Sequence, residues 1–135
     1  MTIQLSVAVR NARLDAIETS IGVSAVLKLR TGAQPANCAA ADAGTVVSTM
    51  ALPVDWMAGA AAGSKALSGV WEDLAADNPG TIAHFRLYAA DGVTCGMQGS
   101  ATITGGGGDM EVDNPVVVAG QKITVTTFTW TDGNA

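Results

Sequence analysis

His84 is the single histidine of the chain, and it limits the catalytic chemistry that the sequence can support. One imidazole cannot form a histidine-based metal cluster, and any serine or cysteine nucleophile would have to use it as its base. On an extended strand Arg86 faces the same side as His84, which disfavours a protonated imidazole. No pattern in the sequence brings an acid, a base and a nucleophile together, so we expect a protein that is not an enzyme.

Three alternating acidic residues, Asp109, Glu111 and Asp113, are the candidates for a metal site. In an extended segment they face one side, and Ca²⁺ accepts carboxylate oxygens as ligands. The segment lacks the spacing of a complete calcium-binding loop, and an acidic edge that discourages unwanted strand pairing explains the same residues. The glycines of residues 105–108 are not followed by the Lys-Ser or Lys-Thr of a phosphate-binding loop. We therefore expect no metal and no cofactor.

The two cysteines, Cys38 and Cys95, do not form a Cys-x-x-Cys motif. Neither a zinc ribbon nor a disulfide framework is implied by this spacing. Disulfides are rare in cytosolic proteins, which favours free and partly buried thiols over a bridge. Whether the two cysteines pair stays open at this point.

The element around which the chain is organised is a hairpin over residues 81–103. Its turn is Ala90-Asp91-Gly92, and Asp-Gly between alternating apolar runs is a strong hairpin signal. In the first arm Phe85 and Leu87 alternate with polar residues, which predicts one core-facing side. The second arm contains Gly96 and Gly99, which mark a bulge or a close approach of the backbone.

The rest of the chain divides into an N-terminal helical segment, residues 1–22, and a β domain, residues 23–135. Ser6 and Gly22 have the positions of caps around a helix from about residue 6 to residue 21. Strands are expected at 23–31, 45–52, 65–71, 116–118 and 122–131, with a surface loop at 32–45 and a bulge near Thr126 or Thr127. Seven or eight strands after one helix predict a mainly β fold, a β-sandwich or jelly roll. The predicted core comprises Leu27, Leu29, Val47, Phe85, Leu87, Ile103, Ile123, Val125 and Phe128.

The composition bounds the class of protein and its partners. The 135 residues fit one domain, and only 14% of them are charged whereas 48% are hydrophobic, so we expect a partner to cover part of the surface. The net charge is −5 and the seven Lys and Arg residues are scattered, which argues against nucleic-acid binding. The N-terminus has no signal-peptide pattern, and no stretch is long enough to span a bilayer, so we expect a protein made and kept in the cytoplasm, without a membrane partner.

Several segments together resemble a family of small tailed-bacteriophage virion proteins. They are VRNARLDAIETSIG, TGAQPANCAAADAGT, LPVDWMAGAAAGSKALSG, AHFRLYAADGVTC, GGGGDMEVDN and ITVTTFTWTDGNA, and they cover nearly the entire chain. The resemblance implies a structural role as a minor capsid or decoration (cement) protein that binds the major capsid protein. It also implies a location on the capsid surface after assembly in the host cytoplasm. With the low charge, a lattice role predicts a homo-oligomer, a trimer first and a dimer second.

Two other functions fit a β domain of this kind. A tail or head-to-tail connecting protein would leave similar sequence traces. A receptor- or carbohydrate-binding module ranks third, because it needs an exposed aromatic shelf and the chain has only six aromatic residues.

The candidate partner contacts lie on the helix and on two loops. Leu14 and Ile17 share a helical stripe with Val7, which either packs on the β domain or docks on another subunit. Trp56 and Met57 either anchor their loop to the core or form an exposed contact patch. Asn37 marks the long loop as the third candidate.

Overall fold

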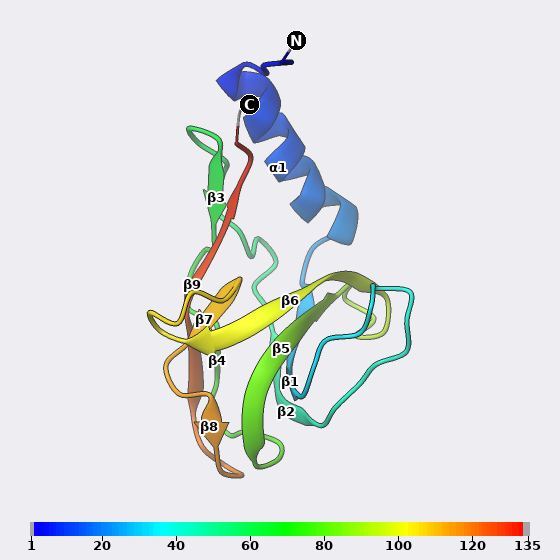
Figure 1. Ribbon diagram of the computed structural model, residues 1–135, viewed down its shortest axis with the longest axis vertical. Helices are drawn as coiled ribbons and strands as arrows, with labels where there is room; N and C mark the ends of the chain where they lie inside the picture. The colour runs from blue at the N-terminus through cyan, green and yellow to red at the C-terminus, as the bar shows by residue number, and fades with distance from the viewer. Residues whose placement is uncertain (1, 134–135) are drawn as a thin grey trace.

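The computed structural model describes residues 2–133 and begins with one helix, α1, which spans Val7–Ile21. The Ser6 side chain accepts a hydrogen bond from the backbone N–H of Val9, and the N–H of Gly22 bonds to the carbonyl of Glu18. These are the two caps that the sequence predicts, so both ends of the helix are confirmed. The helix projects beyond the sheet, beside β3 and the end of β9 (Figure 1).

Within the described residues, nine strands follow the helix. Their bounds are β1 Val26–Thr31, β2 Val46–Ala51, β3 Ser64–Ala66, β4 Glu72–Asp73, β5 Gly80–Tyr88, β6 Cys95–Ile103, β7 Met110–Val112, β8 Val116–Val117 and β9 Ile123–Thr131. The predicted strand 65–71 is confirmed only at its start, in β3 and at the isolated bridge of Leu67 with Met57, and the rest of it links β3 to β4. The long loop 32–45 is confirmed between β1 and β2.

The strands form one curled sheet in the order β2-β1-β5-β6-β7-β9-β3, with β4 added to β9 and β8 added to β5. All the strand pairs are antiparallel except β6 with β7. Phe85 of β5 and Phe128 of β9 are not on neighbouring strands, yet their rings meet edge to face at 5.3 Å. The sheet therefore bends until its two halves enclose one core, which confirms the mainly β, sandwich-like fold with an N-terminal helix.

The central hairpin is formed by β5 and β6, as predicted. Asp91 closes its turn by accepting hydrogen bonds from the N–H groups of Val93 and Thr94, and Gly92 has a φ of 70°. Gly99 marks a close approach, because a Cβ there would lie 2.7 Å from the Phe85 ring. The predicted bulge in the last strand is also found, since Thr126 is the extra residue opposite β7.

The core contains the predicted residues with one exception. Ile103 is 52% exposed, because β6 ends there and its last residue extends beyond the core. Four aromatic rings form one cluster, in which each ring contacts two others at centroid distances of 5.6–6.1 Å. They belong to Trp56, Trp71, Phe128 and Trp130. Long-range packing of this kind brings both loop tryptophans, Trp56 and Trp71, into the core.

Strand β5 is buried on both faces rather than on one. Phe85 and Leu87 face the core, while His84 and Arg86 point the other way and are still only 1% and 2% exposed. The loop 32–45 covers this second face, because Arg86 donates hydrogen bonds to the carbonyls of Asn37 and Ala40. The long loop therefore acts as a covering layer over the centre of the sheet.

Candidate partner-binding groove

The predicted contact residues differ strongly in their exposure. Val7 is 47% exposed, Ile17 is half-buried and Asn37 is exposed, so these three remain accessible. Leu14 is only 3% exposed, and Trp56 and Met57 are 0% and 1% exposed. Of the two alternatives for Trp56 and Met57, the anchor to the core is confirmed and the exposed contact patch is wrong. Leu14 packs the helix on the β domain.

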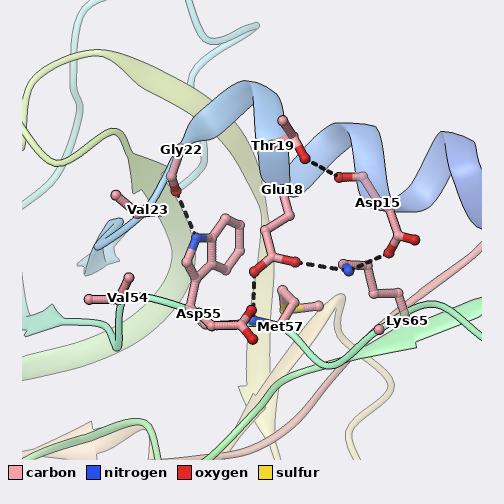
Figure 2. Close-up of a pocket in the computed structure, with 11 residues that line it drawn as sticks. Asp15, Glu18, Thr19, Gly22, Val23, Val54, Asp55, Met57 and Lys65 are labelled. Carbon is pink, nitrogen blue, oxygen red and sulfur yellow. Dashed lines mark hydrogen bonds and ion pairs between the residues drawn. The ribbon is translucent and has the colours of Figure 1, made fainter.

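A groove lies between the C-terminal half of α1 and the segment that carries Trp56 and Met57 (Figure 2). Its volume is about 550 Å³, and Val23 and Val54 lie together at one end, with Asp15 and Lys65 at the other. Val23 and Val54 are 64% and 66% exposed. The groove therefore joins an aliphatic end to a charged end.

The groove segment is held in place by contacts with the end of the helix. The Trp56 indole N–H donates to the carbonyl of Gly22 at 2.9 Å, and the N–H of Met57 donates to the Glu18 carboxylate at 3.1 Å. Trp56 through its side chain and Met57 through its backbone thus fix the wall of the groove instead of facing a partner. The groove is thus preformed, which lowers the entropic cost of binding.

Lys65 is the buried charge of the groove. Its ammonium group, with the side chain 3% exposed, lies 2.6 Å from Asp15 and 2.8 Å from Glu18. Burial alone would lower the pKa of Lys65, but hydrogen bonds to these two carboxylates outweigh it and raise the pKa. The hydrogen bond from Lys65 is in turn the main cause that lowers the pKa of Asp15.

The groove carries an excess of negative charge. Asp15, Glu18 and Asp55 supply three carboxylates against the one ammonium of Lys65, which leaves two negative charges. Asp55 is exposed and forms no hydrogen bond or ion pair with another residue of the described range 2–133. The groove therefore suits a segment that combines a cation with aliphatic side chains.

The three acidic residues near the glycine loop bind backbone rather than gather around an ion. Asp109 accepts from the N–H of Ser100, Glu111 accepts from the N–H groups of Gly105 and Gly107, and Asp113 accepts from the N–H of Thr124. Within residues 2–133, no group of three His, Cys, Asp or Glu side chains is placed to hold a metal ion. These carboxylates stabilise the links around β7.

A polar network fills the space between the loop 32–45 and the sheet. Asp42 pairs with the buried guanidinium groups of Arg30 and Arg86 and accepts the hydroxyl of Tyr88 at 2.7 Å. Burial opposes ionisation of Asp42, but the hydrogen bonds from Tyr88 and Arg86 outweigh it and lower the pKa. His84 bonds to the carbonyl of Gly32 through Nδ1 at 2.7 Å, so the single histidine also holds the loop.

Sequence reasoning missed the groove and the network for different reasons. Asp15 and Glu18 are three residues apart on a helix, a spacing that places both carboxylates on one face. Their common position could therefore be predicted from the sequence. The burial of Lys65 could not be predicted from the sequence, because it depends on the position of β3 beside the helix. Arg30 and Arg86 belong to strands whose alternation was recognised, but the carboxylate between them comes from an irregular loop.

Comparisons with protein-family models, with curated proteins and with solved structures found no match for this chain. In the described part of the chain, no helix has the length and apolar character needed to cross a membrane.

Proposed function

We propose that this protein is a structural component of a tailed-bacteriophage virion, a minor capsid or decoration protein that binds across subunits of the major capsid protein. The observation that carries the proposal furthest is the groove beside α1, which is preformed, aliphatic at one end and negatively charged at the other. The low proportion of charged residues, 14%, and the exposed aliphatic side chains support a surface that a partner covers.

The occupant of the groove is a basic segment of the major capsid protein with aliphatic residues beside its Lys or Arg. The aliphatic residues cover Val23 and Val54, and the cation meets Asp55 and the outer oxygen of Asp15. Such a contact is modest for one copy, because exposed ion pairs contribute little. Repeated over a shell, with each copy touching more than one subunit, modest contacts become collectively strong.

A second copy of this chain is a poorer occupant, because its own cations are already committed. Arg10 and Arg13 bind Asp132, Arg30 and Arg86 bind Asp42, Lys65 binds the helix carboxylates, Lys122 binds Glu72, and Lys28 lies over the Tyr88 ring. All seven Lys and Arg residues fall within the described residues 2–133. A second copy would have to break one of these contacts to fill the groove.

The exposure of the aromatic residues disfavours a carbohydrate-binding module. All six aromatic residues lie within the described chain, where five are buried and Trp130 is half-buried. A shelf for stacking sugars needs exposed rings. A tail or head-to-tail connecting protein would use the same groove, and it is the alternative that the experiments below separate.

The location is tested by imaging virions at a resolution that traces side chains, and by heating particles that lack the gene. We expect density for this chain over boundaries between major capsid protein subunits. Heads of particles that lack the gene should open at a lower temperature than heads that contain the protein. Density on the tail alone, together with unchanged head stability, would replace this proposal with the tail alternative.

The groove is tested by adding purified variants to heads that lack the protein. Asp55→Lys reverses the charge of an unpaired carboxylate, and Val54→Ser removes an aliphatic contact, so each should weaken binding by about 5- to 20-fold. Asp77→Lys makes the same charge change on an exposed residue that lines no part of the groove and should bind like the unmodified protein. Equal losses for Asp55→Lys and Asp77→Lys would show that net charge, and not the groove, governs binding.

A further inference from the structure

Two cysteines far apart in the sequence meet in the fold. Cys38 lies in the loop 32–45 and Cys95 is the first residue of β6, and their sulfur atoms are 2.8 Å apart although 57 positions separate them in the sequence. A disulfide bond has a length of about 2.05 Å, so a small movement of two side chains brings the sulfurs to bonding distance. Both residues are half-buried, and both thiols are free.

The contacts around Cys38 hold it against β6. Arg86 donates to the carbonyl of Asn37 at 2.9 Å and to that of Ala40 at 3.2 Å, so it binds the loop on both sides of Cys38. Gln98 of β6 donates to the carbonyl of Pro35 at 2.6 Å. Asn37 in addition accepts the N–H groups of Ala39 and Ala40 with its own side chain. The proximity of the two sulfurs is thus a result of how the loop is anchored.

We propose that Cys38 and Cys95 form an intrachain disulfide in oxidising surroundings and that this bond pins the loop 32–45 to β6. The oxidant is a small-molecule disulfide such as oxidised glutathione. One protein thiolate attacks it, forming a mixed disulfide and releasing one thiol; the second protein thiolate then displaces the other half. Two protein thiols lose two protons and two electrons, and the oxidant leaves as two thiols.

The half-buried position of both cysteines favours a lasting cross-link once the bond has formed. Burial and the neighbouring Cys38 raise the pKa of Cys95 to about 11, so its thiolate is scarce at neutral pH. Exchange starts from a thiolate, so attack by the Cys95 sulfur is slow. Once formed, the bond is half-buried under the loop, which hinders attack by an external thiol. The loop is then held both by Arg86 and by a covalent bond.

Both thiols are free and half-buried, which confirms the expectation of free and partly buried cysteines, and the proposed bond does not depend on the proposed function. The expectation rested on the rarity of disulfides in cytosolic proteins, whereas the geometry concerns what the fold allows once an oxidant is present. It also concerns a loop, residues 32–45, that is distinct from the groove beside α1. A failure of the disulfide would leave the proposed virion role untouched, and the reverse also holds.

The test compares the full chain equilibrated with oxidised glutathione and with a reducing agent. We expect the oxidised monomer to be lighter by two hydrogen atoms, to resist alkylation at both cysteines and to give a cross-linked peptide that joins Cys38 to Cys95. The bond closes a long loop, so the Tm should rise by about 10 °C over the reduced protein. Cys38→Ser and Cys95→Ser should show no such rise with the same oxidant.

Hydrogen exchange of residues 32–45 tests the pinning itself, and it should slow in the oxidised protein but not in either serine variant. Two alkylatable thiols after oxidation, stable glutathione adducts, or a disulfide-linked dimer would each overturn the proposal. A bond that forms without slowing exchange in the loop would overturn the pinning.

Discussion

Asp42 is the residue on which the buried polar network depends. It is the one carboxylate that pairs with both Arg30 and Arg86, whose side chains are 7% and 2% exposed, while its own side chain is 43% exposed. Two buried guanidinium groups without a counter-charge are costly, because a desolvated cation needs a partner. The network therefore stabilises the fold only while Asp42 is ionised.

Replacement of Asp42 by asparagine should destabilise the protein strongly. We expect Asp42→Asn to lower the free energy of unfolding by about 2–3 kcal/mol, somewhat less than for a fully buried pair, because water screens the exposed side of Asp42. Urea unfolding followed by tryptophan fluorescence measures this change. Asp55→Asn removes an unpaired, exposed carboxylate and should alter the stability by less than about 0.5 kcal/mol. Similar losses in both variants would contradict a special role for Asp42.

Gly99 is the residue that lets β6 pass beneath the Phe85 ring. A Cβ at this position would lie 2.7 Å from one ring atom of Phe85 and 2.9 Å from an oxygen of Asp109. Gly99→Ala should therefore cost about 1–3 kcal/mol of unfolding free energy through overpacking. Thermal unfolding measures the loss, with Gly59→Ala as the control, because a Cβ at Gly59 meets nothing within 4 Å. A neutral Gly99→Ala would mean that the Phe85 ring moves freely.

Helix α1 is fixed to the β domain by few apolar contacts and several polar ones. Leu14 is its one fully buried residue within the described chain, and Asp15 and Glu18 reach Lys65 of β3. Arg10 and Asn11 add hydrogen bonds to Asp132 and to the N–H of Gly63. A helix held in this way responds to the ionisation of its carboxylates.

The attachment of α1 should weaken in acid through Asp15. The pKa of this carboxyl is lowered in the folded state, chiefly by Lys65, so its contribution is complete above the unfolded value of 3.8 and is lost as the pH falls through the folded pKa. Urea unfolding of the unmodified protein and of Asp15→Asn over pH 6 to 2.5 measures the difference. We expect the two stabilities to differ near neutral pH and to converge in acid. A difference that persists at the lowest pH would point to packing of the side chain and not to its charge.

The surface of the folded chain carries aliphatic side chains on several sides. Exposed large hydrophobic residues occur at the start of the helix, beside the groove, and near β8. They are Ile3, Val7, Val9, Val23, Val54, Val70, Leu74, Val93, Ile103, Val116 and Val118. Scattered apolar residues are normal on a monomer, but this number together with few charges favours association.

Light scattering of the purified protein at tens of micromolar should therefore show a homo-oligomer, a trimer first and a dimer second. Val7→Asp and Val9→Asp place charges on the projecting end of the helix and should shift the equilibrium to monomer if that end forms the contact. The matched control is Val93→Asp, a change at the turn between β5 and β6. A monomer at every concentration would contradict the prediction of a homo-oligomer in solution.

The elements that short segments specify were predictable from the sequence. The helix has its caps at Ser6 and Gly22, the hairpin has its Asp91-Gly92 turn, and the bulge at Thr126 follows from two apolar alternations out of phase. Each of these signals is carried by residues close together in the chain, because capping, turn geometry and strand period are local interactions. The mainly β class follows from their sum.

The curl of the sheet and the position of the helix decided which side chains are buried and which distant residues meet. The sequence left open whether Trp56 and Met57 anchor their loop or form an exposed patch, and packing of the Trp56 ring on Trp71 and Trp130 decides for the anchor. Ile103 fits the core pattern but lies past the last covered position of β6. Lys65, Asp42 and the Cys38–Cys95 pair acquire their roles from partners 12 to 57 positions away. Such contacts depend on which strands pair and how far the sheet bends, and no local pattern of residues encodes that geometry.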